Sequence, residues 1–183
     1  MIFKYDMLQT GWGKAEITWD SCTIVYEPSY ISDPYGDMIR AVCSILPGLC
    51  PEYPQKSSSR VHWYMAPLEI VIDLEYREQN LLIAITQFDE SGPQTKKTII
   101  LNETIDTRSF VGALVDSGRD MLMKYGFLGY RHNSVNFEFP MSAFLKLLNY
   151  HSGKSRLHAR QSDSSPLFSS CIHTELSQLA GLN

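Results

Sequence analysis

The chain has 183 residues, of which 44% are hydrophobic and 20% charged, a composition that supports a folded core and excludes global disorder. Its net charge is -4, whereas nucleic-acid binding normally needs an excess of basic residues. No stretch approaches the roughly 18 apolar residues of a membrane span. Lys4 and Asp6 interrupt the apolar patch at the N-terminus, so no signal peptide is predicted. We therefore expect a cytoplasmic protein with no nucleic-acid or membrane partner.

Residues 11–30 predict a first β-hairpin. Ala15, Ile17 and Trp19 alternate with polar residues, and the alternation resumes after a polar turn. Pro28 ends the second strand because proline cannot donate a hydrogen bond to the sheet.

A helix is predicted over residues 34–46. Asp33 is a favourable N-cap, Pro34 suits the first helical position, and apolar residues follow at helical spacing. Pro47 and Gly48 end the helix, and the residues up to 59 have the composition of a loop.

A central hairpin is predicted from Leu68 to Phe88. Ile72 and Leu74 lie on the apolar side of its first strand, and a polar turn at residues 77–80 leads into a second apolar strand. A short strand over residues 60–65 precedes the hairpin. We expect Ile72 and Leu74 to be buried beneath the longest helix of the chain.

The remaining elements are one strand and two helices. A strand covers residues 96–101, and a long helix capped by Asp106 or Thr107 runs to about Tyr125, with Gly126 beyond its end. An aromatic-rich connection over residues 127–139 then leads into a short helix over residues 140–150.

These elements predict an α+β fold, with an antiparallel sheet of about six strands and helices packed on one face in two layers. Residues 1–151 form the single predicted domain. Residues 152–183 are polar and serine-rich, so we expect a disordered or loosely packed tail with a weak helix over residues 174–182.

The outward side of the central hairpin is acidic. Partner-binding candidates on this strand and in the adjoining turns are Glu69, Asp73, Glu75, Glu78, Asp89 and Glu90. A solvated sheet face, an acidic face that binds a partner, and a catalytic carboxylate pair are the three interpretations of this pattern. A catalytic pair requires a cleft and one raised carboxyl pKa, which the sequence does not indicate.

No sequence motif predicts a metal or a cofactor. The five histidines have no metal-ligand spacing, and no phosphate-binding glycine loop or nucleophile elbow is present. The four cysteines are interpreted as ordinary thiols, although Cys43 and Cys50 flank a Pro-Gly break and can approach each other.

Aromatic residues cluster on the early strands, where core packing and a hot spot for a protein partner are both open interpretations. The cluster comprises Trp12, Trp19, Tyr26, Tyr30, Trp63 and Tyr64. An alternative function is a hydrolase or other enzyme with a site near the N-terminus of the 34–46 helix, formed by Asp33, Asp37 and His132.

Three segments together resemble a family of small, uncharacterised bacterial proteins. They are SYISDPYGDMIRAV (29–42), the run from His62 through Pro67 to Phe88, and KYGFLGYRHN (124–133) followed by FEFP (137–140). Small α+β proteins of this kind resemble immunity proteins, which bind and block a cognate bacterial toxin. Together with the acidic side of the central hairpin and the lack of a catalytic motif, this resemblance predicts a non-enzymatic protein-binding module, an immunity protein whose partner is a basic toxin domain.

Overall fold

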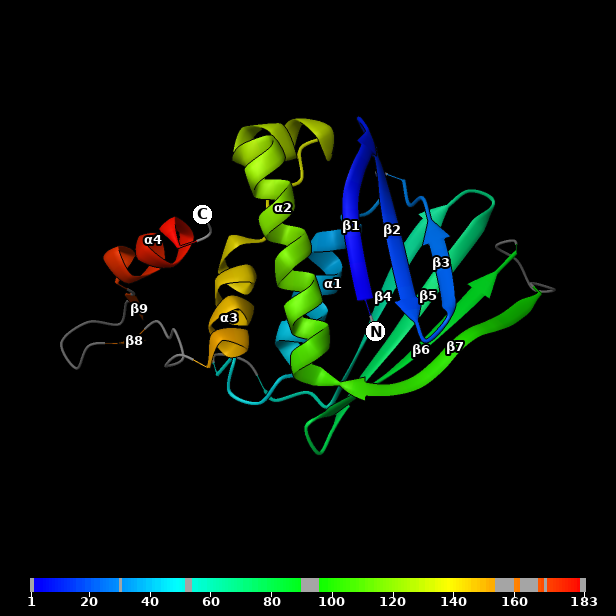
Figure 1. The fold of residues 1–183 in the computed structure, drawn as a ribbon, viewed down its shortest axis with the longest axis horizontal. Coiled ribbons are helices and arrows are strands. Elements are labelled where there is room, and N and C mark those ends of the chain that lie inside the picture. Colours follow the sequence, from blue (N-terminus) through cyan, green and yellow to red (C-terminus); the bar gives the residue numbers. More distant parts are fainter. Residues whose placement is uncertain are drawn as a thin grey trace.

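The computed structural model describes residues 2–29, 31–51, 54–89, 96–153, 160–161, 168–169 and 171–181. Within these residues, two antiparallel sheets and four helices make an α+β fold (Figure 1). The predicted fold class is confirmed. The prediction of one sheet with about six strands is corrected, because seven strands divide between a three-stranded and a four-stranded sheet, beside a short two-stranded pair.

The three-stranded sheet consists of β1 (Ile2–Gln9), β2 (Trp12–Trp19) and β3 (Cys22–Tyr26) in sequential order. The β2–β3 hairpin was predicted, but β1 was not. In β1, Phe3 and Tyr5 are buried and alternate with more exposed polar residues. This period of two is the signal of a half-buried strand.

The four-stranded sheet consists of β4 (Ser58–Met65), β5 (Leu68–Arg77), β6 (Asn80–Phe88) and β7 (Lys97–Asp106), again in sequential order. All three pairings are antiparallel. The predicted β5–β6 hairpin is confirmed. β4 begins before its predicted start, and β7 continues well past Leu101.

Helix α1 (Pro34–Ile45) begins as predicted. Asp33 caps it by accepting a hydrogen bond of 3.1 Å from the Gly36 amide. The buried indole of Trp63 donates a hydrogen bond of 3.1 Å to the Pro34 carbonyl, which fixes the start of α1 on strand β4.

Helix α2 (Thr107–Asn133) begins at the predicted cap, where Asp106 accepts from the Ser109 amide. Gly126 has φ of 62° and ψ of -177°, which breaks the helix where its end was predicted. Residues 127–133 then resume helical geometry. The predicted connection over residues 127–139 is therefore wrong for residues 127–133, and only residues 134–139 connect α2 to the next helix.

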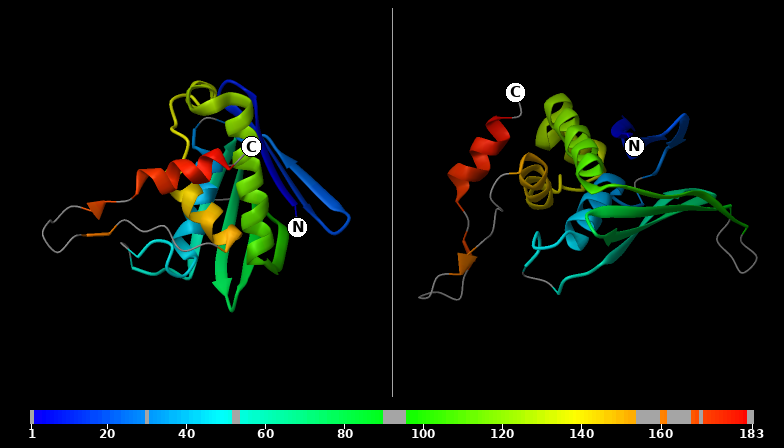
Figure 2. Two further views of the ribbon diagram at one scale, coloured as in Figure 1. Left: turned by 60° about the vertical axis from the view of Figure 1, so that its left-hand side comes forward. Right: turned by 60° about the horizontal axis from the view of Figure 1, so that its bottom comes forward.

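The helices lie on one side of the four-stranded sheet, together with the three-stranded sheet (Figure 2). Ile72 and Leu74 are buried as predicted, but α1 is the helix that packs on β4 and β5. The longer α2 packs instead on β1 and against β7. β1 occupies the surface of α2 that was assigned to the central hairpin, so the prediction of the covering helix is wrong.

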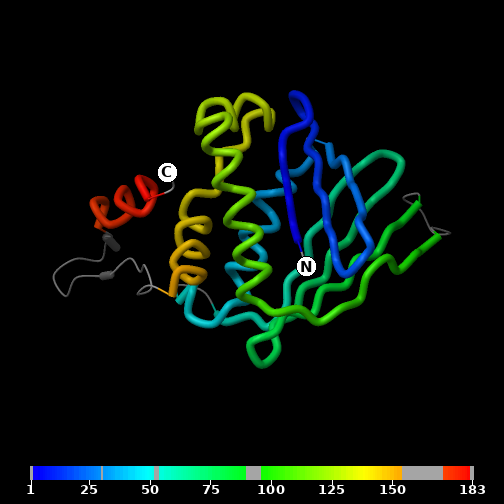
Figure 3. The backbone as a smooth tube through the Cα atoms, viewed as in Figure 1, coloured from blue at the N-terminus to red at the C-terminus, as the bar shows by residue number. Residues whose placement is uncertain are grey.

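Helix α3 (Met141–Ser152) packs on α1 and α2 and ends at Gly153, which has φ of 64°. Beyond it lie β8 (Arg160–Gln161), β9 (Phe168–Ser169) and α4 (Ile172–Ala180). In Figure 3, α4 lies beyond α3, on the side away from the three-stranded sheet. None of the α4 side chains is buried, and Gln178 donates a hydrogen bond to Asn149 of α3. The rest of the predicted tail lies outside the described residues.

Aromatic side chains occupy the centre of the core. Phe3 lies 6.0 Å from Phe110 and 6.4 Å from Trp63, measured between ring centroids, and Tyr26 lies 6.4 Å from Trp63. Core packing is thus confirmed for Tyr26 and Trp63. Tyr64 is partly exposed, and Tyr30 lies outside the described residues.

Candidate functional site

One face of the four-stranded sheet bears no helix or strand among the described residues (Figure 2). We call it the open face. The registers of the three strand pairings place on it the side chains of Arg60, His62, Tyr64, Glu69, Val71, Asp73, Glu75, Leu82, Ala84, Thr86, Phe88, Lys97, Ile99, Asn102 and Thr104. The central strand therefore presents its acidic residues outward, as the sequence predicted.

Each of the three outward carboxylates on β5 meets a basic side chain. Arg60 donates to both oxygens of Asp73, at 2.6 and 3.2 Å. His62 Nδ1 lies 2.6 Å from Glu69 Oε1. These partners of the predicted residues were not identified from the sequence.

The third pair joins Arg77 to Glu75 on the same strand, with N–O distances of 2.7 and 2.8 Å. This guanidinium lowers the pKa of the Glu75 carboxyl and keeps it ionised. The side chains of all three pairs are exposed or partly exposed, so the pairs organise the surface more than they stabilise the fold.

The turns place the remaining candidates at opposite ends of the β5–β6 hairpin. Glu78 lies in the β5–β6 turn with φ of 45°, and Asp89 follows β6 and accepts from the Gln87 side chain at 3.0 Å. In the described part of the chain neither carboxylate forms an ion pair. Glu90 lies outside the described residues.

Two open hollows adjoin strand β4. One, of about 430 Å³, lies on the open face over the Arg60–Asp73 pair and is also lined by Leu82 and Ala84. The other, of about 390 Å³, lies between α1 and β4 and is lined by residues that include Arg40 and His62. Both hollows are wide and shallow, which suits contact with a surface better than enclosure of a small molecule.

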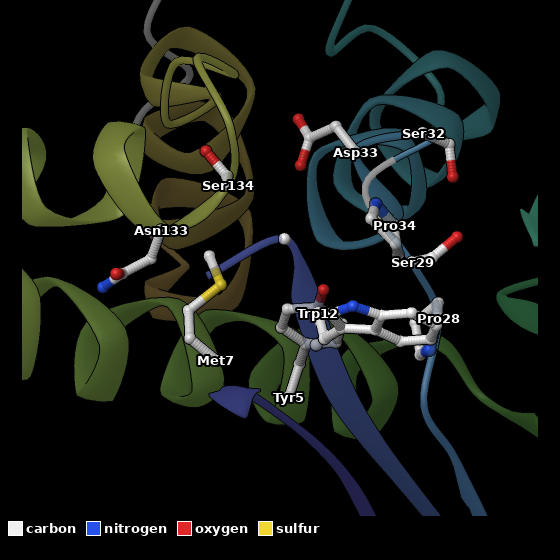
Figure 4. A pocket seen from close by; sticks show the side chains of 12 residues that line it. Tyr5, Met7, Trp12, Pro28, Ser29, Ser32, Asp33, Pro34, Asn133 and Ser134 are labelled. Carbon is white, nitrogen blue, oxygen red and sulfur yellow. The ribbon is translucent and has the colours of Figure 1, made fainter. Parts of the chain in front are cut away.

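A smaller cavity lies where the β1–β2 turn, the segment before α1 and the end of α2 meet (Figure 4). Tyr5, Trp12, Asp33 and Ser134 are among its lining residues. Its volume of about 10 Å³ is room for roughly one water molecule. Residues from the segments that carry the family resemblance therefore meet around this cavity, but the cavity has no space for a substrate.

The carboxylate of Asp33 is 3% exposed, and its hydrogen bonds are directed to the protein. Besides capping α1, it accepts 2.9 Å hydrogen bonds from the Tyr130 hydroxyl and the Arg40 guanidinium. Burial raises the pKa of Asp33 more than Tyr130 and Arg40 lower it. The contacts of this carboxylate are those of a structural anchor.

The structure does not connect the three residues of the enzyme alternative. Arg40 bridges Asp33 and Asp37, with the second contact at 3.0 Å. Within the described residues, no hydrogen bond or ion pair joins the His132 side chain to either carboxylate. No group of three His, Cys, Asp or Glu side chains suited to a metal ion occurs in the same part of the chain.

Within the described ranges, each helix is too short or too polar to cross a membrane. Comparison with protein-family models, curated proteins and solved structures found no match to this chain. The resemblance to a bacterial family therefore stays a prediction from the sequence segments that carry it.

Proposed function

We propose that this protein is a non-enzymatic binding module that neutralises a protein partner, a bacterial toxin domain, through its open face. The observation that carries the proposal is the uncovered side of the four-stranded sheet with its ordered charged pairs. Rigid strands hold these groups in place before binding, so a partner need not order them. The choice of a toxin rests on the resemblance to immunity proteins.

The dimensions of the sheet support a protein as the partner. Four strands at about 4.8 Å spacing and eight residues at about 3.4 Å each make a face on the order of 500 Å². A standard interface buries about 800 Å² on each side. The partner must therefore also reach the adjoining turns, where Glu78 and Asp89 lie.

The three carboxylates on β5 are acceptors for basic groups of a partner, while Arg60, Arg77 and Lys97 keep the open face close to neutral. Glu69, Asp73 and Glu75 have exposed or partly exposed side chains, so arginine or lysine side chains of a partner can join or replace the present counter-ions. Glu78 and Asp89 add negative charge at the two ends. Such complementarity speeds association and makes it sensitive to salt.

The partner is sought in the gene immediately upstream, which we expect to encode a toxin region. Co-expression with that region should protect cells, and calorimetry should detect a complex that weakens as salt rises. If the upstream product is not toxic, or if the protein neither binds it nor protects, the proposal fails.

A charge swap tests the surface. Arg60→Asp combined with Asp73→Arg keeps the cross-strand ion pair but reverses its polarity, so folding should be unaffected. Binding should weaken by about tenfold or more, as for charge reversal inside an interface. Asp120→Arg, on the exposed side of α2, is the control and should bind as the wild type does. Equal binding by all three proteins would exclude the open face.

A further inference from the structure

Two thiols meet at the C-terminal end of α1. Cys43 lies in the last turns of the helix, and Cys50 follows the chain reversal at Gly48. Their Sγ atoms are 3.4 Å apart. All four cysteines of the chain lie within the described residues, and none is in a disulfide.

The loop between the two cysteines is held in place by hydrogen bonds. Gln55 Nε2 donates to the Ile45 carbonyl at 3.1 Å, and its Oε1 accepts from the Gly48 amide at 3.4 Å. Gly48 has φ of 70°, a conformation that glycine adopts without strain. A disulfide requires an S–S distance of about 2.05 Å, so bonding needs the sulfurs to approach by only about 1.4 Å.

The surroundings of the two sulfurs differ. Cys43 is 2% exposed, whereas Cys50 is partly exposed and can be reached from solvent. Lys146 of α3 places its Nζ 3.7 Å from Cys50 Sγ, next to the sulfur that would carry negative charge during exchange. Cys50 is therefore placed to react with a solute, and Cys43 is placed to react with Cys50.

We propose that Cys43 and Cys50 form a redox-active dithiol that a low-molecular-weight disulfide, such as oxidised glutathione, converts into an intramolecular disulfide. The Cys50 thiolate attacks one glutathione sulfur, which forms a mixed disulfide and releases the other glutathione as its thiolate. Cys43 then loses its proton to solvent and attacks the Cys50 sulfur, which releases the second glutathione. Two protein thiols are oxidised, and one glutathione disulfide is reduced to two thiols.

The site is independent of the proposed function, because neither sulfur belongs to the open face. In a reducing compartment the pair stays in the dithiol form, and an oxidising challenge closes it. The cross-link joins the end of α1 to the loop after it. Restriction of the unfolded chain by this short ring should raise the melting temperature by about 5 °C or more.

The test uses the full chain with Cys22→Ser and Cys171→Ser, since both of these cysteines are exposed. The protein is incubated with oxidised glutathione, and the remaining thiols are then alkylated. After digestion with trypsin, the mass of the peptide of residues 41–56 is measured by mass spectrometry. We expect this peptide to lack two hydrogens and to regain them with dithiothreitol. Stable glutathione adducts on this peptide, or two alkylated cysteines in it, would overturn the proposal.

Single variants in that background test the order of the two steps. Cys43→Ala should trap glutathione on Cys50, whereas Cys50→Ala should leave the buried Cys43 unmodified. Lys146→Gln should slow adduct formation on Cys50 several-fold in the Cys43→Ala protein. Equal adducts in both single variants would contradict the assigned roles. If a single variant fails to fold, the peptide masses of the protein that keeps both Cys43 and Cys50 still show whether the disulfide forms.

Discussion

The hydroxyl of Tyr130 donates a 2.9 Å hydrogen bond to Oδ1 of Asp33, although 97 residues separate the two in the sequence. Both side chains are buried, and the same carboxylate caps α1. The bond therefore joins the C-terminal part of α2 to the start of α1. The start of α1 is also bonded to strand β4, because Trp63 of β4 donates to the Pro34 carbonyl.

Tyr130→Phe removes this bond and leaves the buried carboxylate with one partner fewer. We expect a loss of about 1.5–3 kcal/mol in the free energy of unfolding, the usual range for a hydrogen bond to a charged group. Urea denaturation measures it. Tyr26→Phe is the matched control, because the buried Tyr26 hydroxyl has no hydrogen-bond partner among the described residues. An equal loss of unfolding free energy in both variants would show that the hydrogen bond from Tyr130 to Asp33 does not add to stability.

Asp33 should give stability a distinctive pH dependence. Because burial raises the pKa of Asp33 in the folded state, the folded protein binds a proton on this carboxyl more tightly than the unfolded chain does. The contribution of Asp33 is thus largest in acid and is lost as pH rises from the unfolded pKa of about 3.9 through the raised folded value. The stability of Asp33→Asn relative to the wild type should therefore improve with rising pH, as measured by urea midpoints.

Asp106 should give stability a pH dependence of the opposite sign to that of Asp33. Its hydrogen bonds from Ser109 lower the pKa of Asp106, so its contribution is present above the unfolded pKa and lost as pH falls through the folded one. The stability of Asp106→Asn relative to the wild type should therefore worsen with rising pH. Parallel trends for the two variants would contradict the assigned pKa directions.

Gly118 lies where α2 approaches two buried rings. A Cβ atom at this position would overlap the Tyr35 hydroxyl and the ring of Phe144. Gly118→Ala should lower the free energy of unfolding by about 2 kcal/mol or more, because fully buried rings cannot move aside. In Gly181→Ala the nearest atoms lie 3.6 Å from the new Cβ, and the melting temperature should be unchanged. A stable Gly118→Ala protein would contradict this packing.

Ile72→Asp should prevent folding. Ile72 is 1% exposed between β4 and β6 and beneath α1, so the substitution would bury a charge without a partner. Ile99→Asp is the control, because Ile99 is 65% exposed on the edge strand. Circular dichroism distinguishes them. A native spectrum and melting temperature for Ile72→Asp would mean that the inward face of β5 is wrongly assigned.

A chain that ends near His151, taken here to Gly153 so that α3 keeps its C-cap, should melt within a few degrees of the full chain. The side chains of α4 are exposed or only partly buried, and its hydrogen bond to Asn149 is a small contribution. A chain that ends at Pro140 should not fold, because it lacks the buried Phe144 and Leu147 of α3. A large drop in melting temperature for the chain that ends at Gly153 would show that the tail contributes to the core.

Local sequence patterns identified most elements but not their assembly. The capping signals of Asp33 and Asp106 act within one helical turn, so both helix starts are where they were predicted. Strand β1 shows the same alternation as β5, but Lys4 and Asp6 on its polar side also fit an N-terminal segment that is not a signal peptide, so the alternation alone does not distinguish a strand there. The separation into two sheets depends on tertiary packing, which no local pattern encodes.

The outward acidic side of β5 followed from its alternation, but the counter-ions required the strand register. A two-residue turn at Ala66 and Pro67 places Arg60 directly opposite Asp73, and counting outward from this turn would have found the pair. The bond between Tyr130 and Asp33 had no comparable signal. It joins positions that only the assembled helices bring together.

The packing of β1 on α2 sets an order of events during synthesis. The Tyr5 amide donates to the Ser117 hydroxyl, 112 residues later in the chain. At roughly 5–20 residues per second, a ribosome needs on the order of ten seconds to make that stretch. Throughout this interval the nascent β1–β3 sheet exposes the aromatic face that includes Phe3 and Tyr5. Chaperones that bind exposed apolar segments can therefore reach strands β1–β3 until α2 has been made.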